Sequence, residues 1–362
     1  MSWTAEPFKD CVVDLPHTAV ELPLDYFDET SYQREFTYQK HLNWSDDFAN
    51  KEVSLVFDGA MANTRVFLDG VQIGGHKDGY TPFEIRLTPY LKTAGNLITV
   101  CVDGSENPEI PPFGGQIDYL TYAGIYREVW LKVTDRLSVQ NIMIETDKVL
   151  DTNKSVKVSC FLSNPDDLAL SGTLKAEILD ADSNVIAVQF AEIIGLKTTI
   201  DFFELADIHL WTLENPYLYQ VRVSLDSDKG IDRIIQKIGF RTADFAADGF
   251  RLNGEKLKLI GLNRHQSFPY SGYAQGPASQ ERDADILKYD LACIIVRTSH
   301  YPQSNAFLDR CDEIGLLVLE EIPGWQHIGG DVWKDESVQN VRRMIERDWN
   351  HPSIILWGVR IN

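Results

Sequence analysis

The sequence contains no apolar run of the roughly 18 to 20 residues that a membrane-spanning helix needs. Residues 1–10 also lack the basic and apolar stretches of a secretory signal peptide, so none is expected. Basic residues are outnumbered, because 34 Lys and Arg stand against 54 Asp and Glu and leave a net charge of −20. A nucleic acid would be repelled by this charge. We therefore expect neither a membrane nor a nucleic acid as a partner.

Cysteines are few and widely scattered. Their odd number and the lack of metal-ligand spacing favour neither a disulfide framework nor a metal cluster. We expect reduced and buried thiols, as in a cytoplasmic protein. Long polar runs are missing too, and a chain of 362 residues that is 44% hydrophobic favours two or three domains with sizeable cores. The five cysteines are Cys11, Cys101, Cys160, Cys293 and Cys311.

Short apolar segments separated by turn residues fill residues 1–136, the first expected domain. Residues 64–68 alternate in polarity and end at Asp69-Gly70, a dipeptide typical of tight hairpins. No long amphipathic helix is visible. We therefore expect an all-β sandwich, in which two sheets each bury one face. The expected strands are 53–58, 64–68, 96–102 and 126–133.

The second expected domain, residues 137–242, again reads as strands. Their number and spacing favour an immunoglobulin-like β-sandwich. Residues 211–216 form a turn-rich insertion that begins with Trp211, and we interpret it as a packed corner. The expected strands are 155–162, 172–179, 184–190, 217–225 and 231–240.

The third expected domain, residues 243–362, alternates strands with helices. Its strands are apolar on both faces, which is typical of parallel strands covered by helices. Four strands and three helices match the first half of a (β/α)₈ barrel, whose complete form needs about 250 residues. The expected strands are 256–262, 293–297, 315–319 and 353–359, and the helices begin near Ser279 or Glu281, near Ser304, and before Val338.

Polar clusters follow each of these four strands. Ligands collect beyond the C-terminal ends of parallel strands, so a single pocket accounts for all four clusters. Three interpretations of Glu320 and Glu321 stay open: solvated side chains, a structural ion pair with Arg297 or Arg264, and a catalytic role. His265 fits either a loop hydrogen bond or a site residue. The clusters are Asn263-Arg264-His265, Arg297-Thr298-Ser299-His300-Tyr301-Pro302, Glu320-Glu321-Ile322-Pro323 and Arg360-Ile361-Asn362.

The second cluster carries a family resemblance. Residues 296–302, continued by 311–318, closely resemble the first signature of family 2 glycoside hydrolases, which include β-galactosidases, β-glucuronidases and β-mannosidases. Residues 350–358 resemble the second signature of that family. Residues 124–129 resemble the end of its jelly-roll sugar-binding domain, and 211–219 with 239–241 resemble landmarks of its immunoglobulin-like domain. The resemblance covers the whole chain and implies a jelly roll, an immunoglobulin-like sandwich and a partial TIM barrel.

The resemblance implies retaining hydrolysis of β-glycosides by two carboxyl groups, one acting as acid/base and one as nucleophile. In the family the acid/base glutamate directly follows an asparagine at the end of the fourth strand, and the nucleophile lies much later. The sequence here ends at Asn362. Both catalytic glutamates are thus expected beyond it, the acid/base immediately after Asn362. We expect the 362-residue chain alone to be inactive.

The resemblance also assigns substrate-binding residues. It matches Asn362 to an asparagine that binds the sugar 2-hydroxyl, and Arg297 to an arginine that holds the nucleophile ionised. It matches His300 to a ligand of a sugar hydroxyl. Asp118 lies in the loop 114–123, near where the jelly roll of galactosidases reaches the pocket, although an ordinary loop acid is the competing interpretation. The complete expected set is Asn362, His300, Arg297, His265, Trp325 and Asp118.

Metal and substrate preferences follow from departures from the family pattern. Metal-dependent galactosidases carry Glu-x-His after the third strand, whereas this chain has Trp325-Gln326-His327. One imidazole is a poor site for a hard cation, so we expect no magnesium and no cofactor, and Trp325 is free to offer its ring to a sugar. Gln266-Ser267-Phe268 replaces further histidines of those galactosidases.

A β-galactosidase-like enzyme nevertheless remains the leading hypothesis. The alternatives are a β-glucuronidase or β-mannosidase of the same family, and a non-catalytic carbohydrate-binding protein. A half barrel also leaves its first and fourth strands as open edges, which makes a homo-oligomer a further expectation.

Overall fold

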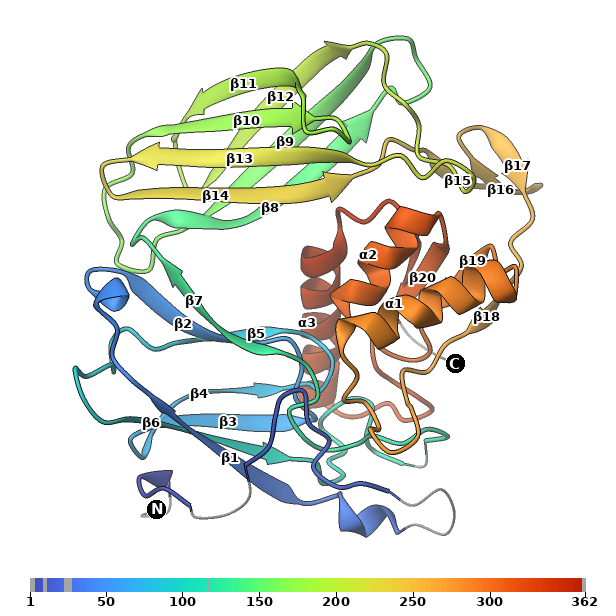
Figure 1. Ribbon diagram of the computed structural model, residues 1–362. Helices are drawn as coiled ribbons and strands as arrows, with labels where there is room; N and C mark the ends of the chain where they lie inside the picture. Colours follow the sequence, from blue (N-terminus) through green and yellow to red (C-terminus); the bar gives the residue numbers. More distant parts are fainter. Residues whose placement is uncertain (1–3, 9–11, 23–27, 116, 360–362) are drawn as a thin grey trace.

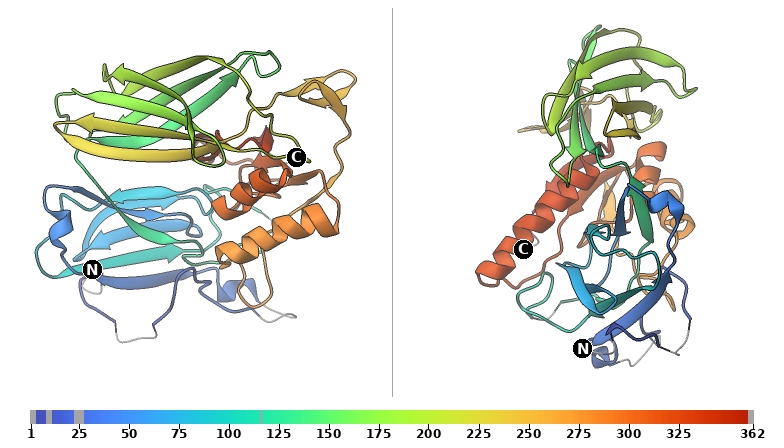
Figure 2. Two further views of the ribbon diagram at one scale, coloured as in Figure 1. Left: turned by 45° about the horizontal axis from the view of Figure 1, so that its top comes forward. Right: turned by 90° about the vertical axis from the view of Figure 1, so that its left-hand side faces the viewer.

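The computed structural model describes residues 4–8, 12–22, 28–115 and 117–359. Two β-sandwiches flank a part built of strands and helices (Figure 1). We refer to β1–β7 as the first sandwich, to β8–β14 as the second sandwich, and to β15–β21 with α1–α3 as the strand–helix part. Both sandwiches contact the strand–helix part, and the long helix α3 lies along one side of the molecule (Figure 2).

The first sandwich consists of two antiparallel sheets with strand orders β1-β6-β3-β4 and β5-β2-β7. The predicted hairpin is confirmed, because Asp69 and Gly70 turn between β3 and β4 with positive φ angles of 50° and 84°. The strands are β1 (Glu35–Leu42), β2 (Glu52–Phe57), β3 (Asn63–Leu68), β4 (Val71–Lys77), β5 (Phe83–Arg86), β6 (Asn96–Asp103) and β7 (Val129–Thr134), with short 3-10 helices at Glu29–Ser31 and Asp46–Phe48.

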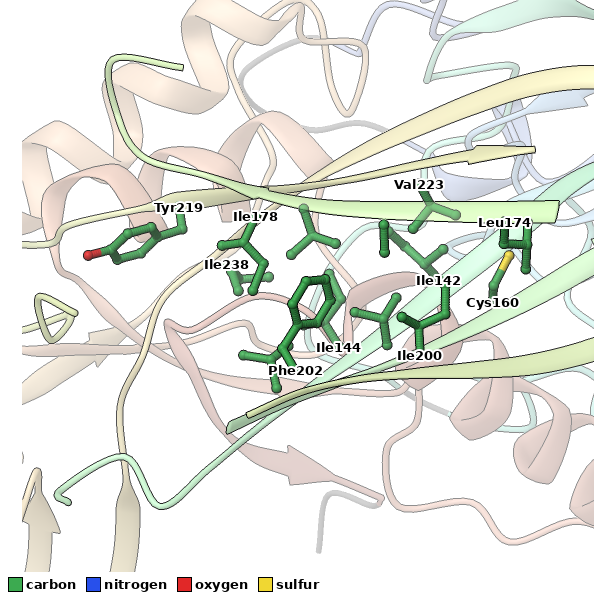
Figure 3. Packing of buried hydrophobic residues seen from close by; sticks show 14 of the residues in the cluster. Ile142, Ile144, Cys160, Leu174, Ile178, Ile200, Phe202, Tyr219, Val223 and Ile238 are labelled. Atoms are coloured by element: carbon green, nitrogen blue, oxygen red, sulfur yellow. The ribbon is translucent and has the colours of Figure 1, made fainter. Parts of the chain in front are cut away.

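The second sandwich pairs the sheets β11-β10-β13-β14 and β12-β9-β8. Its core joins side chains of both sheets, among them Ile142 and Phe202 from one and Ile178 and Val223 from the other (Figure 3). Trp211 is fully buried and donates from Nε1 to the carbonyl of Asp312 at 2.8 Å, so the predicted packed corner is confirmed. The strands are β8 (Ser138–Asp147), β9 (Lys154–Ser163), β10 (Thr173–Leu179), β11 (Val185–Glu192), β12 (Lys197–Leu205), β13 (Tyr219–Ser227) and β14 (Gly230–Ile238).

The strand–helix part begins with a small antiparallel sheet, β15-β16-β17, and continues as a parallel sheet, β18-β19-β20-β21. The parallel order confirms the predicted half of a (β/α)₈ barrel. The strands are β15 (Ala243–Ala246), β16 (Gly249–Leu252), β17 (Glu255–Leu257), β18 (Gly261–Asn263), β19 (Ile295–Arg297), β20 (Leu317–Glu321) and β21 (Ile354–Gly358); the helices are α1 (Pro277–Asp285) with a following π-helix (Ile286–Asp290), α2 (Asn305–Ile314) and α3 (Asp331–Asp348).

The single strand predicted at 256–262 is wrong, because the chain divides it between two sheets. Leu257 pairs with Phe250 in the small sheet, whereas Gly261 pairs with Ile295 in the parallel one. Gly261 suits this close pairing, since a Cβ there would lie 1.6 Å from the carbonyl oxygen of Ile295. The pattern of apolar residues continues across the break and therefore hides it.

The helix predicted before residue 350 is confirmed as α3, but its buried face differs from the apolar stripe. Asn340, Met344 and Asp348 are its buried residues, whereas Val338 is 49% exposed. The side-chain amide of Asn340 is oriented so that both its oxygen and its nitrogen find hydrogen-bond partners. In this orientation its nitrogen donates to Oδ2 of Asp78 in the first sandwich at 3.1 Å. Polar contacts between parts of the fold thus set the orientation of this helix.

Side chains of the strand–helix part fasten it to both sandwiches. Asn350 donates to the carbonyl of Ile142 at 2.9 Å and accepts from the backbone N–H of Ile144 at 2.9 Å. On the other side, Arg127 of the first sandwich donates to the carbonyl of Pro302 at 2.7 Å. These contacts hold both sandwiches against the sheet that carries the polar clusters. Among the described residues, no helix is long and apolar enough to cross a membrane.

Candidate active site

Three of the four polar clusters meet at one edge of the parallel sheet. Asn263 pairs with Arg297 across β18 and β19, and Arg297 pairs with Leu319 across β19 and β20, so the C-terminal ends of these strands lie side by side. His265 and His300 follow two of these ends, and their ring centroids are 5.4 Å apart. The fourth cluster, with the predicted site residue Asn362, lies outside the described residues.

Glu321 is the central group of this site. Its Oε2 accepts from Nε of Arg297 at 2.9 Å, and its Oε1 accepts from Nδ1 of His300 at 2.7 Å. The residue is 1% exposed. Of the three interpretations left open by the sequence, the ion pair with Arg297 is thus formed, at the edge of the sheet where the polar clusters meet. Arg264 instead pairs with Asp283 at 2.6 Å.

The side chain of Arg297 is 34% exposed. In the described part of the chain only its Nε is hydrogen-bonded, to Glu321, so its two terminal nitrogens remain for another partner. A guanidinium held in this way presents donors in a fixed plane, which suits a second carboxylate.

The two histidines present different faces to the site. A carboxylate only accepts hydrogen bonds, so His300 carries a proton on Nδ1 and its Nε2 is left for a ligand. His265 has its Nδ1 3.2 Å from the Tyr301 hydroxyl. Burial lowers the pKa of His265, and the charge of His300 lowers it further. The charge of Asp118 raises this pKa, but by less. The residue as a whole is exposed, but its ring packs against Tyr119 and Tyr301, and the lowered pKa leaves the imidazole neutral at pH 7.

Aromatic rings and a loop of the first sandwich wall the site. Trp325 is half-buried, with its ring 5.0 Å from that of His300. Tyr119 packs 5.3 Å from His265 and 5.8 Å from His300, and the adjacent Asp118 is exposed. The structure thus brings five of the six predicted residues into one neighbourhood. Sequence reasoning missed Tyr119, although it lies next to Asp118 in a segment rich in tyrosine.

Glu320 lies on the opposite side of the sheet from Glu321, because successive residues of a strand face opposite ways. It is fully buried, and its Oε1 accepts from Nη2 of Arg347 at 3.2 Å. Burial and then the charge of Asp348 raise the pKa of Glu320 well above its usual range. Glu320 therefore belongs to the layer between sheet and helices and does not reach the site.

Within the part of the chain that the structure describes, one group of side chains has the spacing for a metal: Asp309, Asp312 and His351, whose ligand atoms lie within 4.8 Å of one another. Nδ1 of His351 lies 2.5 Å from Oδ2 of Asp312, and the surrounding carboxylates raise the pKa of His351 to about 9. A metal ion would have to displace this proton and break the pairing with Asp312 before His351 could bind it.

The Trp325-Gln326-His327 segment does not fit a magnesium site either. His327 has its Nε2 3.1 Å from the carbonyl oxygen of Pro108, and the position of the carboxylate ligand is occupied by an indole. Magnesium prefers several oxygen ligands in octahedral geometry, which this pair of side chains cannot supply.

A cavity of about 180 Å³ lies at a different place, between the first sandwich and the helices. Asp58 and Arg127 line it from the first sandwich, and Ser304 before α2 and Arg347 near the end of α3 line it from the other side. None of the five predicted site residues that the structure describes borders this cavity.

Comparison with known protein families accounts for nearly the whole chain. Residues 11–135 match the sugar-binding domain of glycosyl hydrolases family 2, residues 137–241 match a further family 2 domain, and residues 245–360 match the family 2 TIM barrel domain. The chain belongs to glycosyl hydrolase family 2. The first sandwich is therefore the family's sugar-binding jelly roll, the second its immunoglobulin-like domain, and the strand–helix part the first half of its barrel.

Individual family 2 relatives are similar over almost the full chain. A β-galactosidase of Thermoanaerobacterium thermosulfurigenes is 50% identical over 97% of this chain and 50% of its own length. A β-galactosidase of Rhizobium meliloti is 45% identical over 95% of this chain and 46% of its own length. A solved Bacteroides uniformis β-glucuronidase, 28% identical, superposes with a TM-score of 0.86 over 99% of this chain and 44% of its own. The chain spans about half the length of the curated relatives that it matches.

Proposed function

We propose that this chain supplies the substrate-binding part of a retaining β-glycosidase that removes terminal β-linked galactose. The arrangement of Glu321 between Arg297 and His300 carries the proposal. It fixes a guanidinium with two free terminal nitrogens and an imidazole with a free Nε2 at the C-terminal edge of a parallel sheet, where barrel enzymes bind their ligands. β-Galactosidases 42 to 50% identical to the chain support the choice of sugar.

The described residues supply binding groups rather than the reacting carboxyl groups. Arg297 is placed to hold a nucleophilic carboxylate ionised, since an adjacent cation lowers the pKa of a carboxyl group. His300 and Trp325 offer a hydrogen bond to a hydroxyl and a ring face to the sugar. Both catalytic glutamates are proposed to lie after Asn362, the acid/base immediately after it. Glu321 and Glu320 do not replace them, because each is buried and bound to arginine.

The decisive experiment is to sequence the coding region past codon 362 and to assay the complete product on aryl β-galactoside, β-glucuronide and β-mannoside. A glutamate at position 363 and hydrolysis of the galactoside are the expected result. A stop codon there, or glycan binding without hydrolysis by the complete product, would overturn the enzyme assignment. The 362-residue chain assayed alone should show no turnover above background after rigorous purification.

A β-glucuronidase is the second candidate. A β-glucuronidase of Bacteroides fragilis is 30% identical over 96% of this chain, and solved β-glucuronidases share its fold. In the same assay, preferential hydrolysis of the β-glucuronide would replace the galactosidase assignment by this one.

Cellular location and assembly complete the proposal. Four buried free thiols, Cys101, Cys160, Cys293 and Cys311, support a reducing, cytoplasmic location, which cell fractionation would test. Strands β18 and β21 each have one neighbouring strand among the described residues, and such open edges favour self-association of the isolated chain. Light scattering after gel filtration would measure the mass of the assembly.

A further inference from the structure

Two loops from distant parts of the sequence interlock beside the candidate active site. One is the loop 104–115 of the jelly roll, and the other is the loop 322–330 that follows β20. Nε2 of His327 lies 3.1 Å from the carbonyl oxygen of Pro108. A carbonyl only accepts, so the imidazole donates this hydrogen bond. The other side of the His327 ring meets Trp333 of α3 edge to face, at 6.1 Å between centroids.

The fit between these loops leaves no room for a side chain at two glycines. Gly114 has a φ of +117°, and a Cβ there would lie 2.0 Å from Cδ2 of His327. A Cβ at Gly329 would lie 2.5 Å from Cβ of Trp333 and 3.0 Å from the carbonyl oxygen of Pro108. Each loop thus has a glycine where the other loop touches it. We call the contacts of His327 with Pro108 and Gly114 the loop lock.

The loop lock joins two segments that both continue into the site. On one side, Trp325 precedes His327 by two residues and packs against His300. On the other, the jelly-roll segment continues to Asp118 and to Tyr119, which packs against His265. Only a few residues separate the loop lock from Trp325 on one side and from Asp118 and Tyr119 on the other. We call these three residues the rim of the site, and movement of the loop lock would displace both sides of it.

We propose that His327 is a positioning residue that locks the jelly-roll loop to the barrel and thereby sets the rim of the site where the sugar is selected. The second half of this proposal rests on the proposed function, whereas the lock itself does not. The lock gives His327 a purely mechanical role, in which its Nε2 proton is committed to Pro108 and its ring fills the space above Gly114.

Hydrogen exchange measured by mass spectrometry on the 362-residue chain tests the lock directly. We expect His327→Ala to raise exchange of the backbone amides in residues 109, 110 and 113–115 by about tenfold, because local opening of the loop then no longer breaks the contacts of His327. His327→Gln retains a donor for Pro108 and should restore much of the protection. His41→Ala, a change at an exposed histidine of β1, is the matched control and should leave exchange in this loop unchanged. A thermal unfolding midpoint close to that of the parent chain shows that the variants fold.

A pair of glycine variants distinguishes the lock from general loop strain. Gly114→Ala should increase exchange strongly in the parent chain and much less in the His327→Ala background, since the ring that meets the new Cβ is then gone. The remaining increase reflects the positive φ alone. Gly115→Ala, where nothing lies within 4 Å of a Cβ, should have little effect in either background. Equal effects of Gly114→Ala in both backgrounds would overturn the lock.

Kinetics of the complete enzyme test the second half of the proposal, the role of His327 in substrate selection. His327→Ala should raise KM for the preferred aryl glycoside about fivefold and change kcat less than about twofold, because a displaced rim weakens binding of ground state and transition state alike. An unchanged KM would overturn the role in substrate selection even if the exchange data support the lock. Absence of any hydrolysis by the parent enzyme would overturn the proposed function and leave the lock to be judged by exchange alone.

Discussion

His351 lies between the end of α3 and the start of β21, and it is only 8% exposed. Its Nδ1 is 2.5 Å from Oδ2 of Asp312, and its Nε2 is 3.9 Å from Oδ1 of Asp348. Burial by itself lowers the pKa of this imidazole. The charges of Asp312, Asp348 and Asp309 outweigh burial and raise the pKa from 6.5 to about 9. The folded protein therefore carries a buried imidazolium at neutral pH.

This raised pKa makes stability depend on pH in a defined window. Below pH 6.5 the proton is bound in both the folded and the unfolded state, so its full stabilising contribution is present. Between pH 6.5 and about 9 the folded state holds a proton that the unfolded state has lost, and the free energy of unfolding falls as the pH rises. At about 1.4 kcal/mol per pH unit, the total loss across the window is about 3 kcal/mol.

Urea denaturation at intervals between pH 6 and pH 9.5 measures this loss, with His351→Gln as the variant that cannot titrate. Other groups also titrate in this range, so the informative quantity is the difference between the parent and variant free energies of unfolding. This difference should shrink by about 3 kcal/mol from pH 6.5 to above pH 9. His41→Gln, at an exposed position of β1, should follow the parent curve. Parallel curves for the parent and His351→Gln would refute the assignment of the buried charge.

Three further substitutions test the contacts that build the site. Glu321→Gln removes the carboxylate that holds Arg297. We expect the free energy of unfolding to fall by about 2 kcal/mol, a moderate loss because Arg297 is partly exposed. An unchanged free energy of unfolding in urea would contradict the ion pair. Asn350→Ala removes two hydrogen bonds to β8 and should lower the free energy of unfolding by about 2 kcal/mol. Hydrogen exchange should accelerate more in β8 than in β13. Equal effects on both strands would refute a local role of Asn350. Trp211→Phe leaves the carbonyl of Asp312 without its donor and should cost about 1 to 3 kcal/mol, and an unchanged urea midpoint would contradict that role.

Local sequence patterns predicted the units of the fold well. Alternating polarity and the Asp69-Gly70 turn specify the hairpin of β3 and β4, and apolar strands between helices specify the parallel sheet. These signals are reliable because they depend on neighbours within a few residues. The break between β17 and β18 was missed, since both halves are apolar and the pattern does not state with which strand each half pairs.

The features of the site likewise divide into those that the sequence predicted and those that it did not. The polar clusters after successive strands were identified because the C-terminal ends of parallel strands share one edge. Glu320 and Glu321 are adjacent and chemically alike, and the alternation of a strand requires only that they face opposite ways. Which of them enters the site depended on where Arg297 and Arg347 lie in the folded chain.

The sequence by itself determined the order of sandwich, sandwich and half barrel, the membership in family 2 and the edge of the sheet at which the polar groups gather. Only the tertiary structure decided that Glu321 joins Arg297 to His300, that α3 buries Asn340 rather than Val338, and that His327 fastens a loop some 200 residues away. The physical reason is that periodicity records contacts between near neighbours, whereas hydrogen bonds between distant loops leave no repeating pattern in the chain.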